Sequence, residues 1–270
     1  MVISISNYQL NAQDKVNSVT GINSIPKDKV KVSDVVAIPS PFDAFLALGK
    51  ISQKNPVNWD QVIQKNSLLI KASDYKGKVA VSFALGMKVS DALVAIKAKN
   101  IDELNNSSRT IEELANKLGV DKSRLSRAEK VRSLATEGDW LGVFLELGFL
   151  QTDIISELSN EARSDERALI TAAGWLQGVT HISYAISSHY SEEASSLLRE
   201  PVLLAQLNKD LSRSSAAVAN HPEVKELQEI ISKLEAVVNI PRDGTLTKEK
   251  VDFVLQQGRA ATGIVKKTKS

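Results

Sequence analysis

Two histidines on one predicted helix are the residues whose types and spacing could do chemistry. His181 and His189 lie in the stretch 165–199, which also holds Trp175 and a Gly-x-x-x-Gly pair. Imidazole nitrogens bind metal ions and exchange protons near neutral pH. On an ideal helix this spacing separates the two rings by about 80° around the axis and about 12 Å along it. Zinc–nitrogen bonds are only about 2.0–2.1 Å long, so one metal ion cannot take both histidines.

His189 has a second candidate partner in Glu193, one helical turn further on. Side chains at positions i and i+4 share a helix face, so the two could hold a metal ion or share a proton. No second helix with matching ligands accompanies them, and the His-Glu-x-x-His pattern is absent from the sequence. We therefore expect no metal and no other cofactor, with His189 and Glu193 as the weakest of the alternatives.

His181 shares a helix row with Gly174 and Gly178. Because small residues let a second helix approach the backbone, we expect His181 at a helix crossing, hydrogen-bonded to a neighbour. A ligand contact or a pH-sensitive pair is the alternative. Tyr184 lies one turn beyond it, toward His189.

Asp91 is a carboxylate within an apolar row of a predicted helix over 74–99. It would either bond a neighbouring helix or be a buried carboxylate with a raised pKa, which would mark a functional site. Together, the candidate ligand-binding residues are Trp175, His181, Tyr184, His189 and Asp91.

The elements that must position these residues are helices. Apolar residues recur three or four apart along most of the chain after residue 40, and strand patterns are almost absent. Helix starts are indicated at Ser40-Pro41, Asn58, Asp74, Asp121 and Asp139, and at Asp102 or Ser108. Further helices are predicted over 165–190, 201–219, 222–238 and 248–266, and Gly119 and Gly138 stand where glycine ends helices. We predict an all-α bundle of about nine helices around a long central helix at 165–190.

The domain organisation follows from where apolar residues are sparse. Residues 1–37 are polar and interrupted by Pro26, which predicts a flexible N-terminal arm. Residues 38–270 are predicted to form a single all-helical domain, with a division into two subdomains near residue 120 left open.

Composition excludes several classes of function. With 34 basic and 32 acidic residues the net charge is +2, which gives no field to attract nucleic acid or an anionic membrane. The absence of cysteine excludes disulfides, thiolate zinc sites and cysteine nucleophiles. We also find no Walker loop, no Gly-x-Ser-x-Gly and no uncharged apolar run near the ~20 residues of a membrane span. The compartment stays open: periplasmic or secreted if a leader is removed, and otherwise cytoplasmic.

Four short motifs carry a resemblance. In order, they are Ile38-Pro39-Ser40-Pro41-Phe42, the stretch 77–87, Gly138-Asp139-Trp140 and Gly174-Trp175-Leu176-Gln177-Gly178. Over roughly 38–219 the chain resembles an uncharacterised all-helical bacterial family whose members are generally exported. The resemblance implies an α-helical fold and life outside the cytoplasm, and it implies no activity.

The function expected from these patterns is that of a non-enzymatic helical interaction or scaffold protein, acting on a protein partner or by self-association. A helical module that binds a small ligand near Trp175, His181 and His189 is the first alternative. A metal-dependent enzyme at the same place is the second.

Overall fold

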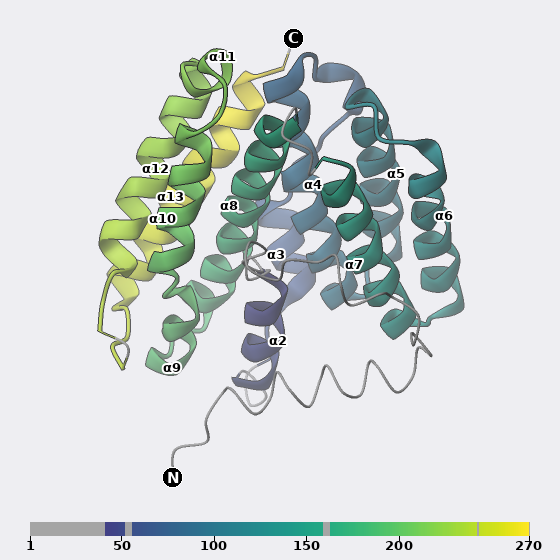
Figure 1. Ribbon diagram of the computed structural model, residues 1–270. Coiled ribbons are helices and arrows are strands. Elements are labelled where there is room, and N and C mark those ends of the chain that lie inside the picture. The colour runs from purple at the N-terminus through teal and green to yellow at the C-terminus, as the bar shows by residue number, and fades with distance from the viewer. Residues whose placement is uncertain (1–40, 52–55, 159–162, 242, 270) are drawn as a thin grey trace, which may run out of the picture. The chain divides into compact units, whose positions relative to one another are not determined.

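The computed structural model describes residues 41–51, 56–158, 163–241 and 243–269 of the chain (Figure 1). The predicted arm over 1–37 lies outside the described residues. The prediction of an all-α bundle is confirmed, because 81% of the structure is helical, nine of the helices are long, and no strand occurs in the described ranges. An isolated β-bridge joins Tyr75 to Lys269 near the C-terminus.

The helices follow one another through short connections. Their bounds are α2 Pro41–Ile51, α3 Trp59–Asn66, α4 Lys78–Ala98, α5 Ile101–Lys117, α6 Lys122–Glu137, α7 Trp140–Glu157, α8 Ser164–Ser188, α9 Glu192–Ser195, α10 Pro201–Ser212, α11 Ala216–Ala219, α12 Pro222–Val238 and α13 Lys248–Lys267, with 3₁₀ turns at Ala72–Asp74 and Ser196–Leu198. The long helix predicted at 165–190 is α8.

Three predicted helix boundaries are wrong. Asp74 belongs to the 3₁₀ turn, and α4 begins only after Gly77, whose φ of +77° suits glycine. Helix α5 is capped by Asn100 rather than by Asp102 or Ser108. The segment 201–219 divides into α10 and α11, since the chain turns at residues 213–215. By contrast, Asn58 and Asp139 cap α3 and α7 as predicted, each accepting a hydrogen bond from a backbone N–H of the first turn.

Helices α4 and α8 form the centre of the bundle, and they pack more extensively on each other than any other pair does. Glycines make this close approach possible: a Cβ on Gly86 would collide with the carbonyl oxygen of Ile170, and Gly174 lies directly against the Gly86 backbone. One turn further along α4, the Ser90 hydroxyl donates to the Gly174 carbonyl oxygen at 2.5 Å. The two backbones are therefore in direct contact at the middle of both helices.

The remaining long helices lie on either side of this pair. In Figure 1, α5, α6 and α7 lie on one side of α4 and α8, while α10, α12 and α13 lie on the other. Helix α13 packs closely on α8, because a Cβ on Gly258 would overlap the Thr180 side chain. Helix α8 consequently has neighbours on almost every side, which explains why most of its residues are buried.

Helix α4 is long and apolar enough, by length and composition, to cross a membrane. In this structure its most apolar window lies entirely inside the protein, between α5 and α8. A core helix of a helical bundle has the same composition, so this feature is weak evidence for a span. The absence of a membrane span thus stays a prediction.

Candidate functional site

The centre of the candidate site is the carboxylate of Asp91, which lies on α4 and is fully buried. One oxygen, Oδ1, accepts a hydrogen bond from Gln177 Nε2 at 2.7 Å and lies 2.9 Å from His181 Nε2, both on α8. The other, Oδ2, accepts the backbone N–H of Leu68 at 3.1 Å. The ammonium group of Lys88 lies 3.5 Å from Oδ2. One carboxylate therefore joins α4, α8 and the loop that follows α3.

Lys88 is a fully buried lysine, one turn before Asp91 on α4. Its ammonium group lies 2.8 Å from a carboxylate oxygen of Glu103 on α5, and it donates to the Leu68 carbonyl oxygen at 3.4 Å. Glu103 also accepts a hydrogen bond from Ser107 at 2.9 Å. Burying a lone ammonium costs several kcal/mol, so the two carboxylates are what makes Lys88 tolerable in the core.

Electrostatics keep the Asp91 carboxylate ionised. Burial acts to raise the pKa of Asp91, but the Lys88 ammonium and the hydrogen bonds from His181 and Gln177 outweigh it, and the net pKa lies below the usual value. The alternative that Asp91 is a buried carboxylate with a raised pKa is therefore wrong in its direction. The carboxylate is buried, and its partners supply the compensation that water would otherwise give.

His181 has two differently placed ring nitrogens. Nε2 lies next to Asp91 Oδ1, and because a carboxylate only accepts, this nitrogen carries a proton and donates. Nδ1 is buried and has no hydrogen-bond partner among the described residues. In the neutral ring Nδ1 is then a bare acceptor. In the Asp91–His181 pair the carboxylate accepts a hydrogen bond from one ring nitrogen, as in a histidine general base oriented by a carboxylate. The other ring nitrogen, which would act as the base, is enclosed in the core.

Further polar contacts extend the cluster toward α3 and α13. Gln177 Nε2 also donates to the Asn66 carbonyl oxygen at 2.9 Å, and its Oε1 accepts from the Thr262 hydroxyl at 3.2 Å. Arg259 of α13 donates to the side-chain oxygen of Asn66 at 3.2 Å. Helices α3, α4, α5, α8 and α13 therefore each contribute at least one side chain to this hydrogen-bonded network.

We define the polar cluster as Asp91, Lys88, His181, Gln177, Glu103 and Asn66. The first four side chains are completely buried, and the Glu103 side chain is 20% exposed at the edge. No group of three or more His, Cys, Asp or Glu suited to a metal ion occurs in the part of the chain that the structure describes. The cluster can hold charges in fixed positions.

The predicted site residues do not all meet. The structure brings Asp91 and His181 together. Trp175 is buried in the apolar core, while Tyr184 lies against the Arg259 guanidinium at 5.6 Å from its ring centre. His189 is exposed at the C-terminal end of α8.

Glu193, the other half of the suggested metal pair, lies in the short helix α9 and is exposed. The end of α8 separates it from His189, so the two are not on one continuous helix face. The suggested His189–Glu193 pair is therefore not formed on one helix, while a pocket near Trp175, His181 and His189 stays a prediction.

The polar cluster contains residues that sequence reasoning missed, chiefly Lys88, Glu103 and Gln177. A signal existed for the first: Lys88 and Asp91 are the two charged residues in the interior of an otherwise apolar helix. Opposite charges one turn apart on an apolar helix indicate a buried pair. Glu103 and Gln177 carry no comparable signal. Glu103 stands among polar neighbours, and Gln177 lies in a helix rich in small residues.

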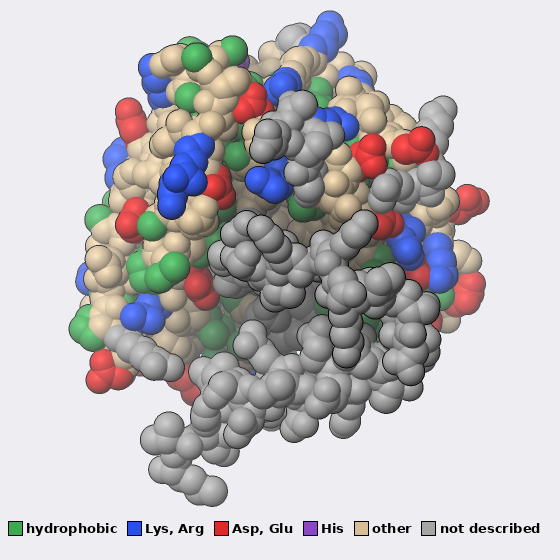
Figure 2. All heavy atoms as spheres, viewed as in Figure 1, with side chains coloured by type: hydrophobic (Ala, Val, Ile, Leu, Met, Phe, Trp, Pro, Cys, Tyr) green, Lys and Arg blue, Asp and Glu red, His purple; other side chains and the backbone are tan. Residues whose placement is uncertain are grey.

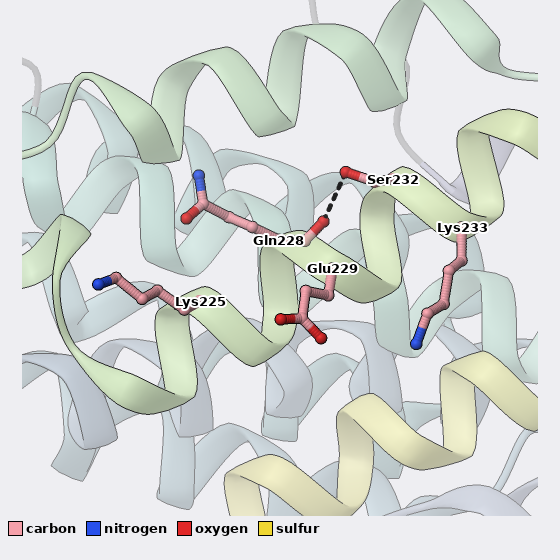
Figure 3. Close-up of a pocket in the computed structure, with 5 residues that line it drawn as sticks. All are labelled: Lys225, Gln228, Glu229, Ser232 and Lys233. Atoms are coloured by element: carbon pink, nitrogen blue, oxygen red, sulfur yellow. Dashed lines mark hydrogen bonds between the residues drawn. The ribbon is translucent and has the colours of Figure 1, made fainter.

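A surface hollow lies on α12, which carries none of the cluster residues. It is lined by Lys225, Gln228, Glu229, Ser232 and Lys233 (Figure 3). The three charged side chains extend away from the helix in different directions and do not converge. The Ser232 hydroxyl donates a hydrogen bond to the Gln228 carbonyl oxygen at 2.9 Å. All five residues come from one helix, so this hollow has the character of an ordinary polar surface.

A further cluster of charged side chains lies between α6 and α7. Glu146 of α7 is nearly buried and accepts from Arg127 at 2.9 Å and from Lys130 at 2.5 Å, while Asp153 accepts from Arg127 at 2.7 Å. Burial opposes ionisation of Glu146, but these two cations lower its pKa overall. On the face drawn in Figure 2, acidic and basic side chains are interspersed in the same way.

Comparison of the chain with protein-family models, with curated proteins and with solved structures gave no match. The resemblance to an exported helical family therefore stays a prediction.

Proposed function

We propose that this chain is a non-enzymatic helical interaction protein. The observation that carries the proposal is the closure of the polar cluster: Asp91, Lys88, Gln177 and His181 are each 0% exposed. A catalytic or ligand-binding group must be reached by its substrate or ligand. The residues with the chemistry to react are here the residues that hold the core together.

The exposed apolar residues support the same proposal. Leu141, Leu145 and Phe149 are exposed on a single face of α7, at 70%, 46% and 48%. Exposed apolar side chains that gather on one element are typical of protein contact sites, whereas scattered ones need no explanation. The protein thus has the Asp91–His181 pair inside and an apolar ridge outside.

Photo-crosslinking in the native host tests this proposal. p-Benzoylphenylalanine is placed at Leu145, and as a control at Lys225 on the exposed face of α12. We expect a covalent protein adduct from position 145 and none from position 225. Absence of any protein adduct, together with a stoichiometric small molecule or metal in native mass spectra of the purified protein, would overturn the proposal.

One observation favours a second candidate, the binding of a small polar molecule within the core. The buried Nδ1 of His181 has no partner among the described residues, and an acceptor in this position usually bonds at least a water molecule. A ligand with one donor could replace that water. Native mass spectrometry distinguishes this candidate, because it requires a mass increment that His181→Phe removes.

A further inference from the structure

We propose that the outer face of α7 is a self-complementary surface on which a second copy of this chain packs antiparallel, with the two-fold axis at Leu145. This inference rests on the proposed function and names the partner. The outer face of α7 is defined here by Leu141, Leu145, Gly148, Phe149 and Thr152.

The first argument is exposure. Among the described residues, six large hydrophobic side chains are exposed, and three of them are Leu141, Leu145 and Phe149. At a spacing of four residues they form one ridge about 12 Å long on α7. Between Trp140 and Thr152 the helix carries one charged residue, Glu146, and this side chain faces inward to Arg127 and Lys130. The ridge residues of α7 therefore carry no charge of their own.

The second argument is the symmetry of the ridge. In a two-fold antiparallel helix pair centred at Leu145, each residue lies opposite the one equally far on the other side of 145. Leu141 then lies opposite Phe149 of the second copy, and Leu145 lies opposite itself. The exposed apolar residues of one copy therefore meet those of the other. A surface for an unrelated helix needs no such palindrome.

Gly148 gives the third argument. A glycine in a helix interior is unfavourable by about 1 kcal/mol relative to alanine. At the crossings of α4 with α8 and of α8 with α13, Gly86 and Gly258 let a second segment come close. At Gly148 an added Cβ would meet no atom within 4 Å, so this glycine has no packing role inside the described chain. An approaching helix would give it the role that the other two have.

The charges along the edge of the face favour an uncharged partner. Arg127 of α6 borders the ridge and is already paired with Glu146 and Asp153, while Lys130 is paired with Glu146. The Arg127 guanidinium also lies over the Phe149 ring, 5.0 Å from its centre, which holds the ring at the surface. An acidic partner would find the cations neutralised, whereas a second copy presents the same neutral ridge and no like charge opposite.

The size of the ridge predicts a weak association. Its three exposed side chains are far fewer than the roughly 20–30 residues that each partner contributes to a standard protein interface. We therefore expect a dimer whose Kd is on the order of micromolar or weaker, so that its population depends on concentration.

Single cysteines test the geometry, because the chain has no cysteine of its own. Leu145→Cys places a thiol on the proposed axis, next to its own copy. Thr152→Cys places one on the same face, about 21 Å from its own copy by helix rise. Under mild oxidation at about tenfold the Kd measured by sedimentation, we expect Leu145→Cys to form the disulfide dimer at least ten times faster than Thr152→Cys.

Sedimentation velocity on variants supplies the second measurement. For the wild type and for Leu69→Glu, an exposed leucine outside α7, we expect the average sedimentation coefficient to rise with concentration. For Leu145→Glu we expect a monomer at all concentrations, with an unchanged circular dichroism spectrum. Equal crosslinking rates at 145 and 152, or a wild type that remains monomeric at millimolar concentration, would overturn the proposal.

The photo-crosslinking experiment separates the two proposals. Adducts between position 145 and a different protein, without self-association, would contradict the proposal that a second copy is the partner. They would still support the proposed interaction function. Adducts of twice the chain mass support both. Absence of every protein adduct and of self-association would overturn the second copy as partner, and a stoichiometric small molecule or metal in native mass spectra would then overturn the interaction function as well.

Discussion

The α4–α8 crossing and the α6–α7 pair each hold a carboxylate beside cations, but the first is buried in the core and the second lies at the surface. Each has a carboxylate, Asp91 or Glu146, whose pKa is lowered by nearby cations although burial opposes this. At the crossing the cation Lys88 is itself 0% exposed, whereas Lys130 and Arg127 beside Glu146 have side chains that are 61% and 37% exposed. Solvent screens the second cluster and leaves the first to its protein partners alone.

The difference indicates distinct roles. Because a buried charge without a partner is costly, the inner cluster permits a single register of α4, α8, α5 and the loop after α3. The outer cluster joins two helices at the surface, beside the apolar ridge of Leu141, Leu145 and Phe149. The cluster around Asp91 therefore specifies how the central helices pack, and the cluster around Glu146 holds α6 and α7 together at the surface.

Removal of the central carboxylate should have the largest effect. Asp91→Ala leaves Lys88, Gln177 and the Leu68 N–H with one acceptor fewer in a buried site, and we expect a loss of about 3–5 kcal/mol of unfolding free energy. The matched variant Glu146→Ala should cost only about 1–2 kcal/mol, because its cations can turn to solvent. Urea denaturation of both variants measures the difference. Equal losses would break the distinction between the two regions.

Alanine at two glycines should give effects of opposite sign. Gly86→Ala forces a Cβ into the Ile170 carbonyl oxygen, and we expect a loss of about 1–3 kcal/mol from the displaced helices. Gly148→Ala meets open space, so below the dimerisation range the monomer should gain up to about 1 kcal/mol from helix propensity. Thermal unfolding at low protein concentration compares them. A stabilised Gly86→Ala would show that α4 and α8 are not in backbone contact.

Much of the architecture was predictable from the sequence, for local reasons. Asn58, Asp139 and the positive-φ glycines at 119 and 138 act on their own neighbouring residues, so their patterns can be recognised without tertiary structure. The start of α4 was missed because Asp74 resembles a cap while Gly77 is the residue whose backbone turns the chain.

The candidate site was predictable only in part, because its partners are distant in sequence. Asp91 and His181 could each be singled out from the periodicity of one helix. That they meet depends on the Gly86–Gly174 crossing, which joins two helices about 90 residues apart in the chain. Glu103 and Gln177 became part of the cluster through tertiary packing alone, which no local pattern indicates.

Acidification should produce the smallest of the expected differences. The folded-state pKa values of Asp91 and Glu146 lie below their ordinary values of about 3.9 and 4.3. Their contribution to stability is thus present above about pH 4–5 and is lost as the pH falls through the lowered folded-state values. In Glu146→Gln one such group is missing, so the unfolding free energy should fall less steeply with pH below about 4.5. An unchanged slope would mean that Glu146 is not stabilised by its cations.

The three histidines of the chain provide the most direct measurement, because they differ in burial. His181 is fully buried within the polar cluster, while His189 is exposed and the His221 side chain is 38% exposed. Native protein treated with diethyl pyrocarbonate and analysed by peptide mass spectrometry should show modification at His189 and His221, with His181 protected until the protein unfolds. Modification of His181 at a rate similar to that of His189 would show that the cluster opens to small molecules, and it would contradict a purely structural role for the Asp91–His181 pair.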